Sequence, residues 1–449
     1  MTIRKINVTS GEVSDDQNTS TGAFDIPVGT TAQRPGSPTE GNIRYNTTLD
    51  TTEIYAEGAW GKVSPLTPIL SSITGNIYNT LAGNLTLNGA NFLTSNLVVS
   101  FTPSGGSAST VTVTPTSDSV ATVAIPSAIY GASAGTVVAI TVTNSDNRTS
   151  AATNKTVVTL PSGGTITTSG NFRIHTFNSS ANFVVPSGVT IANAEYLVIA
   201  GGGSGGDYGG GGGAGGYRSS VVGENSGGGA VAESRITMAA ATYAVTIGAG
   251  GAANTTDASY GAGNNGVASS VIGGSVSISS VGGGKAGYYN NVDGSAGGSG
   301  GGPGIAEQVG NAVGGAGTSG QGYKGGDNTA GRGGTGTYPG GAGGGGAGAV
   351  GTNGSAKGGA GQPGGTGVAS SITGSSVTRG GGGGGLAASS GVGGAGGAGG
   401  GGTANDYNGA SRHGTANTGG GGGAHVGTNS SSYSGNGGSG VVIIRYVLP

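Results

Sequence analysis

Tyrosine, asparagine, aspartate, arginine and histidine interrupt the glycine runs late in this sequence and are its best candidates for chemistry. A tyrosine ring offers a rigid apolar face and a hydroxyl group at low entropic cost. Asn, Asp and Arg side chains can hydrogen-bond the hydroxyl groups of a sugar. About half of these tyrosines are expected only to fill gaps in the scaffold, so the prediction concerns the cluster. The candidate contact residues are Tyr288, Tyr289, Asn290, Asn291, Tyr323, Tyr338, Asp406, Tyr407, Arg412, His413, His425 and Tyr433.

The same residue types do not make a recognisable catalytic or metal site. His175, His413 and His425 share no metal-binding spacing, and the chain has no cysteine. His175 alternates within a strand pattern and is expected to be structural. Matches to Gly-x-Gly-x-x-Gly carry no information among 108 glycines, and no Ser–His–Asp or paired-carboxylate arrangement can be argued. We therefore expect a non-enzymatic protein with no metal and no cofactor.

Composition and charge exclude two classes of partner. Charged residues make up 8% of the chain, against roughly 25% in ordinary globular proteins. The net charge is −2 and no basic face or run is present, so nucleic-acid binding is not expected. The strongest apolar runs, residues 196–200 and 441–448, are too short to cross a bilayer, so no membrane insertion is expected.

The glycine content divides the sequence into two regions of different composition, with the boundary near Gly201. Of the 108 glycines, 18 lie in residues 1–200 and 90 in the last 249 positions. A flexible linker is the simple interpretation, but the apolar run 441–446 requires partner strands, and the best ones, 196–200 and 242–247, lie on the far side of the glycine. The glycine is therefore expected to be ordered, as extended helices of the polyproline-II type. Residues 266–273 recur as 367–374, which indicates one structural step used twice.

Residues 1–64 predict a small β-meander. Ile43 and Tyr45 alternate with polar residues, as in a half-buried strand, and Tyr45 and Trp60 are expected to pack in its core. Two short strands cannot bury a core alone, so another copy or another protein is needed. The segment Gly-x-Ile-Arg-Tyr-Asn, followed by an aromatic strand that ends in Ala59-Trp60, resembles a small module found near the ends of phage tail and structural proteins.

Residues 65–162 predict a β-sandwich. Apolar residues alternate at Leu85 and Leu87, at Val99 and Phe101, and in later runs that turn residues separate. Several short strands in about a hundred residues suggest an immunoglobulin-like fold. Residues 68–73 and 85–92 resemble the IPT/TIG family, which implies a spacer or a carbohydrate-adjacent module.

Residues 163–449 resemble the glycine-rich domain of many phage fibres and environmental viral proteins. The sequence features that carry the resemblance are residues 183–190, 196–203, 245–251 and, at the end, 438–446. The resemblance implies a distal domain that contacts a host cell.

Together these features predict an all-β chain made of an N-terminal meander (1–64), an immunoglobulin-like sandwich (65–162) and a glycine-rich β domain with polyglycine-II-type helices (163–449). The predicted function is that of a phage tail fibre, located in the virion, whose glycine-rich domain mediates host attachment. The start of the sequence lacks a signal-peptide core, which fits release by host lysis. Expected partners are further copies in a homotrimer, virion proteins at the N-terminal region, and a host surface glycan or outer-membrane protein. A capsid-decorating fibre and a bacterial surface adhesin are the alternatives.

Overall fold

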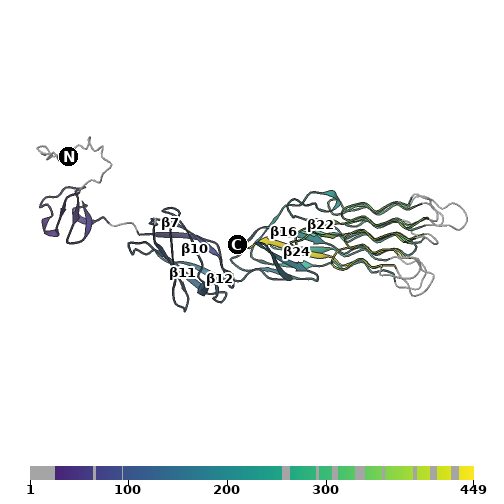
Figure 1. The fold of residues 1–449 in the computed structure, drawn as a ribbon, viewed down its shortest axis with the longest axis horizontal. Helices are drawn as coiled ribbons and strands as arrows, with labels where there is room; N and C mark the ends of the chain where they lie inside the picture. The colour runs from purple at the N-terminus through teal and green to yellow at the C-terminus, as the bar shows by residue number, and fades with distance from the viewer. Residues whose placement is uncertain are drawn as a thin grey trace, which may run out of the picture.

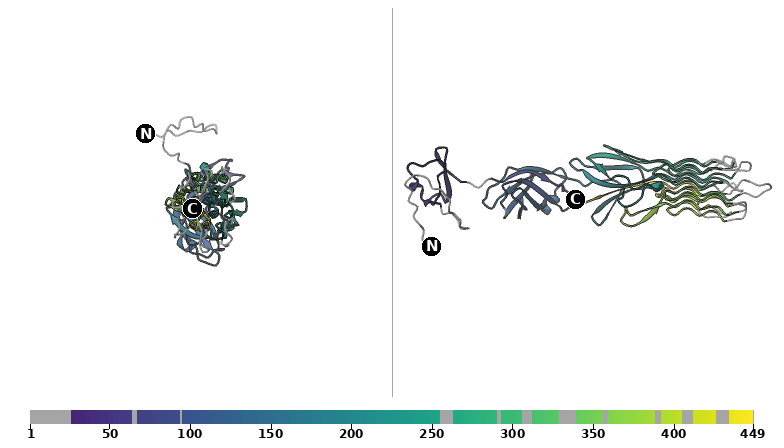
Figure 2. Two further views of the ribbon diagram at one scale, coloured as in Figure 1. Left: turned by 90° about the vertical axis from the view of Figure 1, so that its right-hand side faces the viewer. Right: turned by 90° about the horizontal axis from the view of Figure 1, so that it is seen from above.

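The described residues form three bodies that follow one another along the long axis of the molecule (Figures 1 and 2). We call them the N-terminal module (26–63), the sandwich (67–160) and the glycine body (161–448). Among the described residues, no helix is long and apolar enough to cross a membrane. The computed structural model describes residues 26–63, 67–93, 95–254, 263–289, 293–305, 312–328, 339–355, 359–387, 392–404, 412–425 and 434–448.

The N-terminal module is a four-stranded sheet in the order β1-β2-β3-β4, with β1 parallel to β2 and the other pairs antiparallel. Its buried side chains are Arg44, Asn46 and Glu53, and none of its described apolar side chains is buried. Its elements are β1 (Val28–Gly29), η1 (Thr31–Gln33), β2 (Ile43–Asn46), β3 (Thr51–Ala56) and β4 (Ala59–Lys62).

This arrangement corrects the predicted orientation of β2. Ile43 is exposed and Tyr45 half-buried, whereas the polar Arg44 and Asn46 point inward. Trp60 is also only half-buried. The predicted packing of Tyr45 and Trp60 in an apolar core is therefore wrong, because a charged network around Glu53 occupies the inside of the module.

The sandwich consists of a three-stranded sheet, β10-β7-β5, and a five-stranded sheet, β6-β12-β11-β8-β9. Leu85, Leu87, Val99, Phe101 and Ile140 are fully buried between the two sheets, which confirms the predicted alternation. Its elements are β5 (Ile69–Thr74), β6 (Ile77–Tyr78), β7 (Asn84–Ala90), β8 (Leu97–Pro103), β9 (Ser109–Val113), β10 (Val120–Ala124), α1 (Ser127–Tyr130), β11 (Val137–Thr143) and β12 (Thr153–Val158).

The glycine body begins with two packed sheets. One has the order β13-β14-β24-β16-β17, with β18 also on β16, and the other β15-β19-β20-β21; β22 and β23 form a separate hairpin. The strands are β13 (Thr165–Ser169), β14 (Phe172–Phe177), β15 (Ala181–Val185), β16 (Ile191–Ile199), β17 (Tyr217–Ser219), β18 (Ile236–Met238), β19 (Ala241–Thr246), β20 (Ser269–Gly273), β21 (Val276–Ser280), β22 (Val368–Ser370), β23 (Val377–Arg379) and β24 (Val441–Val447); a short 3-10 helix, η2, spans Gly227–Gly229.

The last strand, β24, lies in the middle of the first sheet. It pairs with β16, where Leu197 faces Ile443, and on its other side with β14. The predicted pairing of the C-terminal strand with 196–200 is thus confirmed. The second predicted partner is wrong, because β19 pairs with β15 and β20 in the other sheet.

An apolar cluster joins the sandwich to the glycine body. Tyr78 of the sandwich is buried in the cluster that fills the space between the two sheets of the glycine body, and Leu81, Val158 and Leu160 pack against that cluster. Ser162 forms an isolated antiparallel bridge with Val184. The two bodies therefore share one core at their junction.

Beyond the sheets, the chain runs back and forth as long glycine segments that lie side by side (Figures 1 and 2). Their backbone hydrogen bonds repeat every three residues, so that successive N–H groups donate to three different neighbouring segments. This three-residue repeat of hydrogen-bond partners occurs in residues 201–206 and again in residues 381–386. In residues 201–206, the donor and acceptor pairs are Gly201 to Val267, Gly202 to Gly438, Gly203 to Gly213, Ser204 to Asn264, Gly205 to Gly435 and Gly206 to Gly210.

The segments approach so closely that a side chain would not fit between them. A Cβ atom on Gly202 would lie 2.1 Å from the carbonyl oxygen of Gly420, and one on Gly383 would lie 2.0 Å from that of Gly422. Both distances are far inside van der Waals contact. Glycine is required here by the close approach of two backbones.

Each copy of the internal repeat enters a β-hairpin. Ser269 and Ser370 occupy the same place in the repeat, and both are buried. Two residues further on, Val271 and Ile372 are buried as well. The first copy leads into the β20–β21 hairpin, where Ser269 pairs with Ser280, and the second into β22–β23, where Ser370 pairs with Val377. Both copies therefore enter a hairpin, but with different registers.

Candidate functional site

A cluster of polar and aromatic side chains lies where the glycine segments end, away from the sheets. We call it the tip cluster and define it as Asp207, Tyr208, Tyr289, Arg412 and His425. The segments that carry these residues hold one another through the backbone. Asp207 and His425 form a parallel bridge, and the N–H of Tyr208 donates to the carbonyl of His425 at 2.8 Å. The N–H of Tyr289 donates to the carbonyl of Asp207 at 3.1 Å.

Aromatic rings form one side of the tip cluster. The rings of Tyr208 and Tyr289 meet edge to face, with centroids 6.1 Å apart. Tyr208 also packs against a small apolar cluster that contains Ile305 and Leu386. Both tyrosines remain half-buried, so the pair has a firm base and an accessible surface.

Asp207 is the polar centre of the tip cluster. Its Oδ1 accepts a hydrogen bond from the N–H of Ser434 at 3.2 Å and lies 4.0 Å from Nδ1 of His425. Burial raises the pKa of Asp207, whereas its hydrogen bonds with Ser434 and Asn254 and the nearby Arg412 cation oppose that rise.

His425 is neutral at physiological pH. Its side chain is buried, and burial together with the Arg412 cation lowers its pKa to about 4. Burial also lowers the pKa of Arg412, while Asp207 acts in the opposite direction. The contact between His425 and Asp207 is therefore a polar contact rather than an ion pair at neutral pH.

The tip cluster can hold a polar ligand by hydrogen bonds and ring contacts. Its histidine is buried and neutral. The described residues contain no group of three His, Asp or Glu side chains that could hold a metal ion. The arrangement is suited to binding.

The predicted contact residues divide into three groups. Tyr288, Tyr289, Arg412, His413 and His425 lie at or beside the tip cluster; His413 is exposed, and its Nδ1 accepts from the N–H of Asn436 at 2.9 Å. Tyr323 lies apart from them, next to η2, where its hydroxyl group approaches Gly229. The remaining predictions, Asn290, Asn291, Tyr338, Asp406, Tyr407 and Tyr433, lie outside the described residues.

Sequence reasoning missed Asp207 and Tyr208. A signal was available, because this Asp-Tyr pair interrupts a glycine run and repeats the dipeptide Asp406-Tyr407. The remaining predicted histidine, His175, is structural as expected: it is buried between the rings of Phe183 and Tyr446, and its Nδ1 lies 2.8 Å from the carbonyl oxygen of Gly163.

Comparisons with known proteins bear mainly on the glycine body. A family model described as a glycine-rich domain matches residues 175–447. No curated protein matches the chain. Among solved structures, the chain is similar to the FN1–FN3 domains of chicken CNTN1, at 11% identity over 46% of this chain and 67% of that one, with a TM-score of 0.19.

Proposed function

This chain belongs to the glycine-rich domain family, and from that premise we propose that it is a non-enzymatic phage tail-fibre protein that attaches virions to the host cell. The observation that carries the proposal is the position of the tip cluster. The glycine segments extend away from the N-terminal module (Figure 1), and Asp207 and His425 pair where two of these segments end. A recognition surface at one end and an attachment module at the other are what a fibre requires.

The glycine segments act in this proposal as a stiff scaffold of polyglycine-II-type helices. A threefold helix has three residues per turn, so its successive N–H groups point in three directions. The three-residue period of the hydrogen bonds in residues 201–206 and 381–386 supports this interpretation. The close backbone contacts at Gly202 and Gly383 support it too.

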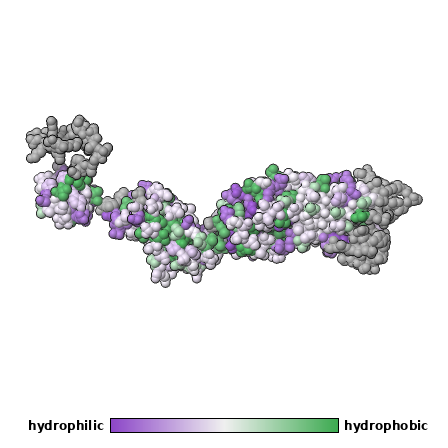
Figure 3. All heavy atoms as spheres, viewed as in Figure 1, coloured by the Kyte–Doolittle hydropathy of each residue, from purple (hydrophilic) through white to green (hydrophobic). Residues whose placement is uncertain are grey.

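Specificity is proposed to lie in the residues that interrupt the glycine. In Figure 3 the sheet part of the glycine body carries purple and green patches, whereas the part made of glycine segments is mostly pale. Such a surface offers few features to a ligand. The half-buried tyrosine pair and the polar groups behind it can hydrogen-bond sugar hydroxyl groups and cover an apolar sugar face. We propose a cell-surface glycan as the ligand, with an outer-membrane protein as the second candidate.

Replacing Tyr288 and Tyr289 together by alanine is expected to weaken host-cell binding roughly thirtyfold or more. The change removes the ring that completes the tyrosine pair and leaves the glycine segments intact. Loss of one aromatic anchor costs about 2 kcal/mol or more at a binding hot spot, which is roughly a thirtyfold loss of affinity. Binding of fluorescently labelled full-length protein to host cells measures the effect.

Tyr323→Ala is the matched control, because Tyr323 is also a half-buried tyrosine of the glycine body but lies beside η2. It is expected to bind like the wild type. Equal binding by the double variant and the wild type would place recognition elsewhere. The melting temperatures of all three proteins establish that the variants are folded.

We expect the full-length protein to be a homotrimer. The N-terminal module exposes Leu49 and Val63, which are 38% and 45% accessible, and buries no apolar side chain among its described residues. Four short strands without an apolar core are not stable alone, and closed symmetric association supplies the missing contacts. Light scattering on the purified protein measures the mass, and a clean monomer at micromolar concentration would contradict the expectation.

Locating the protein on the virus particle distinguishes three hypotheses: a tail fibre, a capsid-decorating fibre and a bacterial adhesin. Antibody-gold labelling of purified virions is expected to mark the tail. Labelling of the capsid would favour the decorating fibre. Labelling of uninfected bacteria, with none on virions, would favour the adhesin.

A further inference from the structure

The N-terminal module contains a cavity of about 330 Å³ beside Trp60 of β4. Val28, Pro35, Ile43 and Trp60 give it an apolar wall, and Gln33 and Arg44 contribute polar groups. Val28 is 68% exposed and Ile43 41% exposed, so the rim is open to a partner. None of the residues that line the cavity is acidic.

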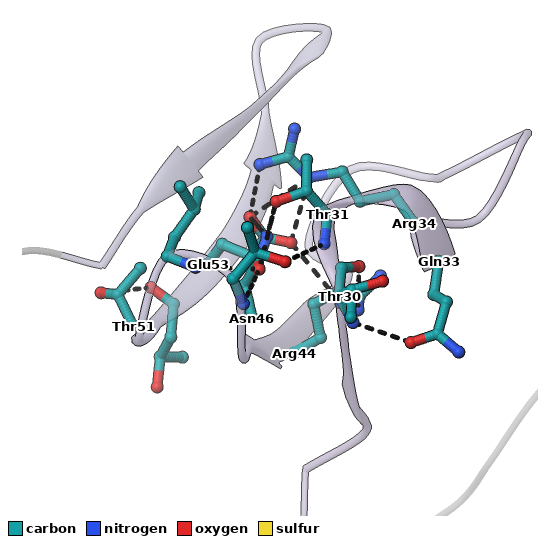
Figure 4. A network of polar contacts seen from close by, with 11 residues as sticks. Thr30, Thr31, Gln33, Arg34, Arg44, Asn46, Thr51 and Glu53 are labelled. Atoms are coloured by element: carbon teal, nitrogen blue, oxygen red, sulfur yellow. Dashed lines mark hydrogen bonds and ion pairs between the residues drawn. The ribbon is translucent and has the colours of Figure 1, made fainter.

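Two guanidinium groups beside this cavity share one carboxylate (Figure 4). Arg34 donates to Glu53 through Nε at 3.1 Å and through Nη2 at 2.5 Å. Asn46 adds a hydrogen bond to Oε2 of Glu53 at 3.0 Å. The hydrogen bond from Arg34 is the main cause that lowers the pKa of Glu53, so this carboxylate is charged at neutral pH.

The buried guanidinium group of Arg44 is only partly satisfied by hydrogen bonds and ion pairs. Its Nη2 donates to the carbonyl oxygen of Thr30 at 2.9 Å, and its Nε lies 3.5 Å from Oε1 of Glu53 and has no hydrogen-bond partner. Only 5% of the residue is exposed. Of the residues that line the cavity, Arg44 is the one that carries a charge, and burial strengthens its attraction for an anion.

Trp60 gives this charge an aromatic neighbour. The guanidinium carbons of Arg34 and Arg44 lie 5.9 and 6.0 Å from the centre of its ring, within the range of cation–π contacts. Tyr55 meets the ring edge at 5.6 Å. The indole is thus held in place while remaining half-buried.

We propose that this cavity binds an extended acidic peptide segment of another virion protein, with an apolar or aromatic side chain next to the carboxylate. The carboxylate pairs with Arg44, and the apolar side chain packs on Trp60, Val28 and Ile43. A second copy of this chain is the alternative occupant, and the titration below distinguishes it from an acidic peptide. The inference rests on the proposed function, in which this module attaches the fibre to the particle.

The chain has a single tryptophan, so tryptophan fluorescence reports on the cavity directly. Full-length protein is titrated with the blocked peptide acetyl-Phe-Asp-Phe-Asp-Gly-amide and with its neutral counterpart, which has Asn in place of Asp. The acidic peptide is expected to give a saturable change. The neutral peptide is expected to bind roughly tenfold more weakly, because it cannot form a charge-assisted hydrogen bond.

Val28→Asp is the test variant, because it places a negative charge on an exposed rim residue and disturbs no buried contact. It is expected to lose the response to the acidic peptide. Val63→Asp, at an exposed position that does not line the cavity, is the matched control and is expected to respond normally.

Three results would overturn the inference: no saturable change, equal affinity for both peptides, or a change that depends on protein concentration without peptide, which would identify a second copy as the occupant. Attachment of the same proteins to particles that lack the fibre is measured in parallel. If particles still take up a wild-type protein that ignores the peptides, the inference fails and the proposed function stands.

Discussion

Truncation after Gly440 is expected to unfold the glycine body and make it sensitive to protease. The deletion removes β24 from between β14 and β16. Val442, Ile444 and Tyr446 leave one apolar core, and Val441 and Ile443 leave the other. At about 1.5–3 kcal/mol per large side chain, the loss is comparable with the whole stability of a typical domain, roughly 5–15 kcal/mol.

Limited proteolysis followed by mass spectrometry of the fragments measures this effect. Fragments that begin and end inside residues 201–440 are expected from the truncated chain and not from the full-length one. Truncation after Val447 is the control, because it keeps every residue of β24 and, of the described residues, removes Leu448 alone, whose N–H donates to Asn171. Equal resistance of the two truncated chains would show that the terminal strand does not close the glycine body.

The second large effect is expected from a single methyl group inside the glycine segments. Gly383→Ala would place its Cβ 2.0 Å from the carbonyl oxygen of Gly422 and 2.6 Å from its carbonyl carbon. Both atoms belong to a backbone that neighbouring segments hold in place by hydrogen bonds. Overpacking of this kind costs about 1–3 kcal/mol or more, and the melting temperature of the glycine body is expected to fall by several degrees.

Gly36→Ala is the matched control for this experiment. A Cβ atom there meets nothing within 4 Å, so the change is expected to leave the melting temperature unaltered. Thermal unfolding followed by circular dichroism compares the two variants. If Gly383→Ala and Gly36→Ala have the same melting temperature, the glycine segments can move apart to accept a methyl group, and they are packed less rigidly than their contacts indicate.

The strands of the sandwich could be predicted because alternation with a period of two is a direct consequence of strand geometry. Leu85, Leu87, Val99 and Phe101 followed that pattern into the core. Alternation in β2 was equally clear, but a period alone does not say which face is inside. There Arg44 and Asn46 point inward, since Glu53 offers them a buried partner.

The candidate site was accessible to sequence reasoning only in part. Composition identified Tyr289, Arg412 and His425 because they stand out from glycine. Their grouping around Asp207 depends on backbone contacts between residues far apart in the sequence, such as Asp207 and His425, which local spacing does not reveal. The same limit explains why Tyr323 was grouped with the other candidates. It has the expected residue type, but it lies next to η2.

The central position of β24 also determines where a protein or tag fused to the C-terminal end would lie. Val447 pairs with Phe172, and Figure 1 places the C-terminal end beside the junction of the sandwich and the glycine body. A fluorescent protein or affinity tag fused there would sit at the waist of the rod. Both ends would then stay free, so single molecules could be anchored by their middle while the tip probes a cell surface.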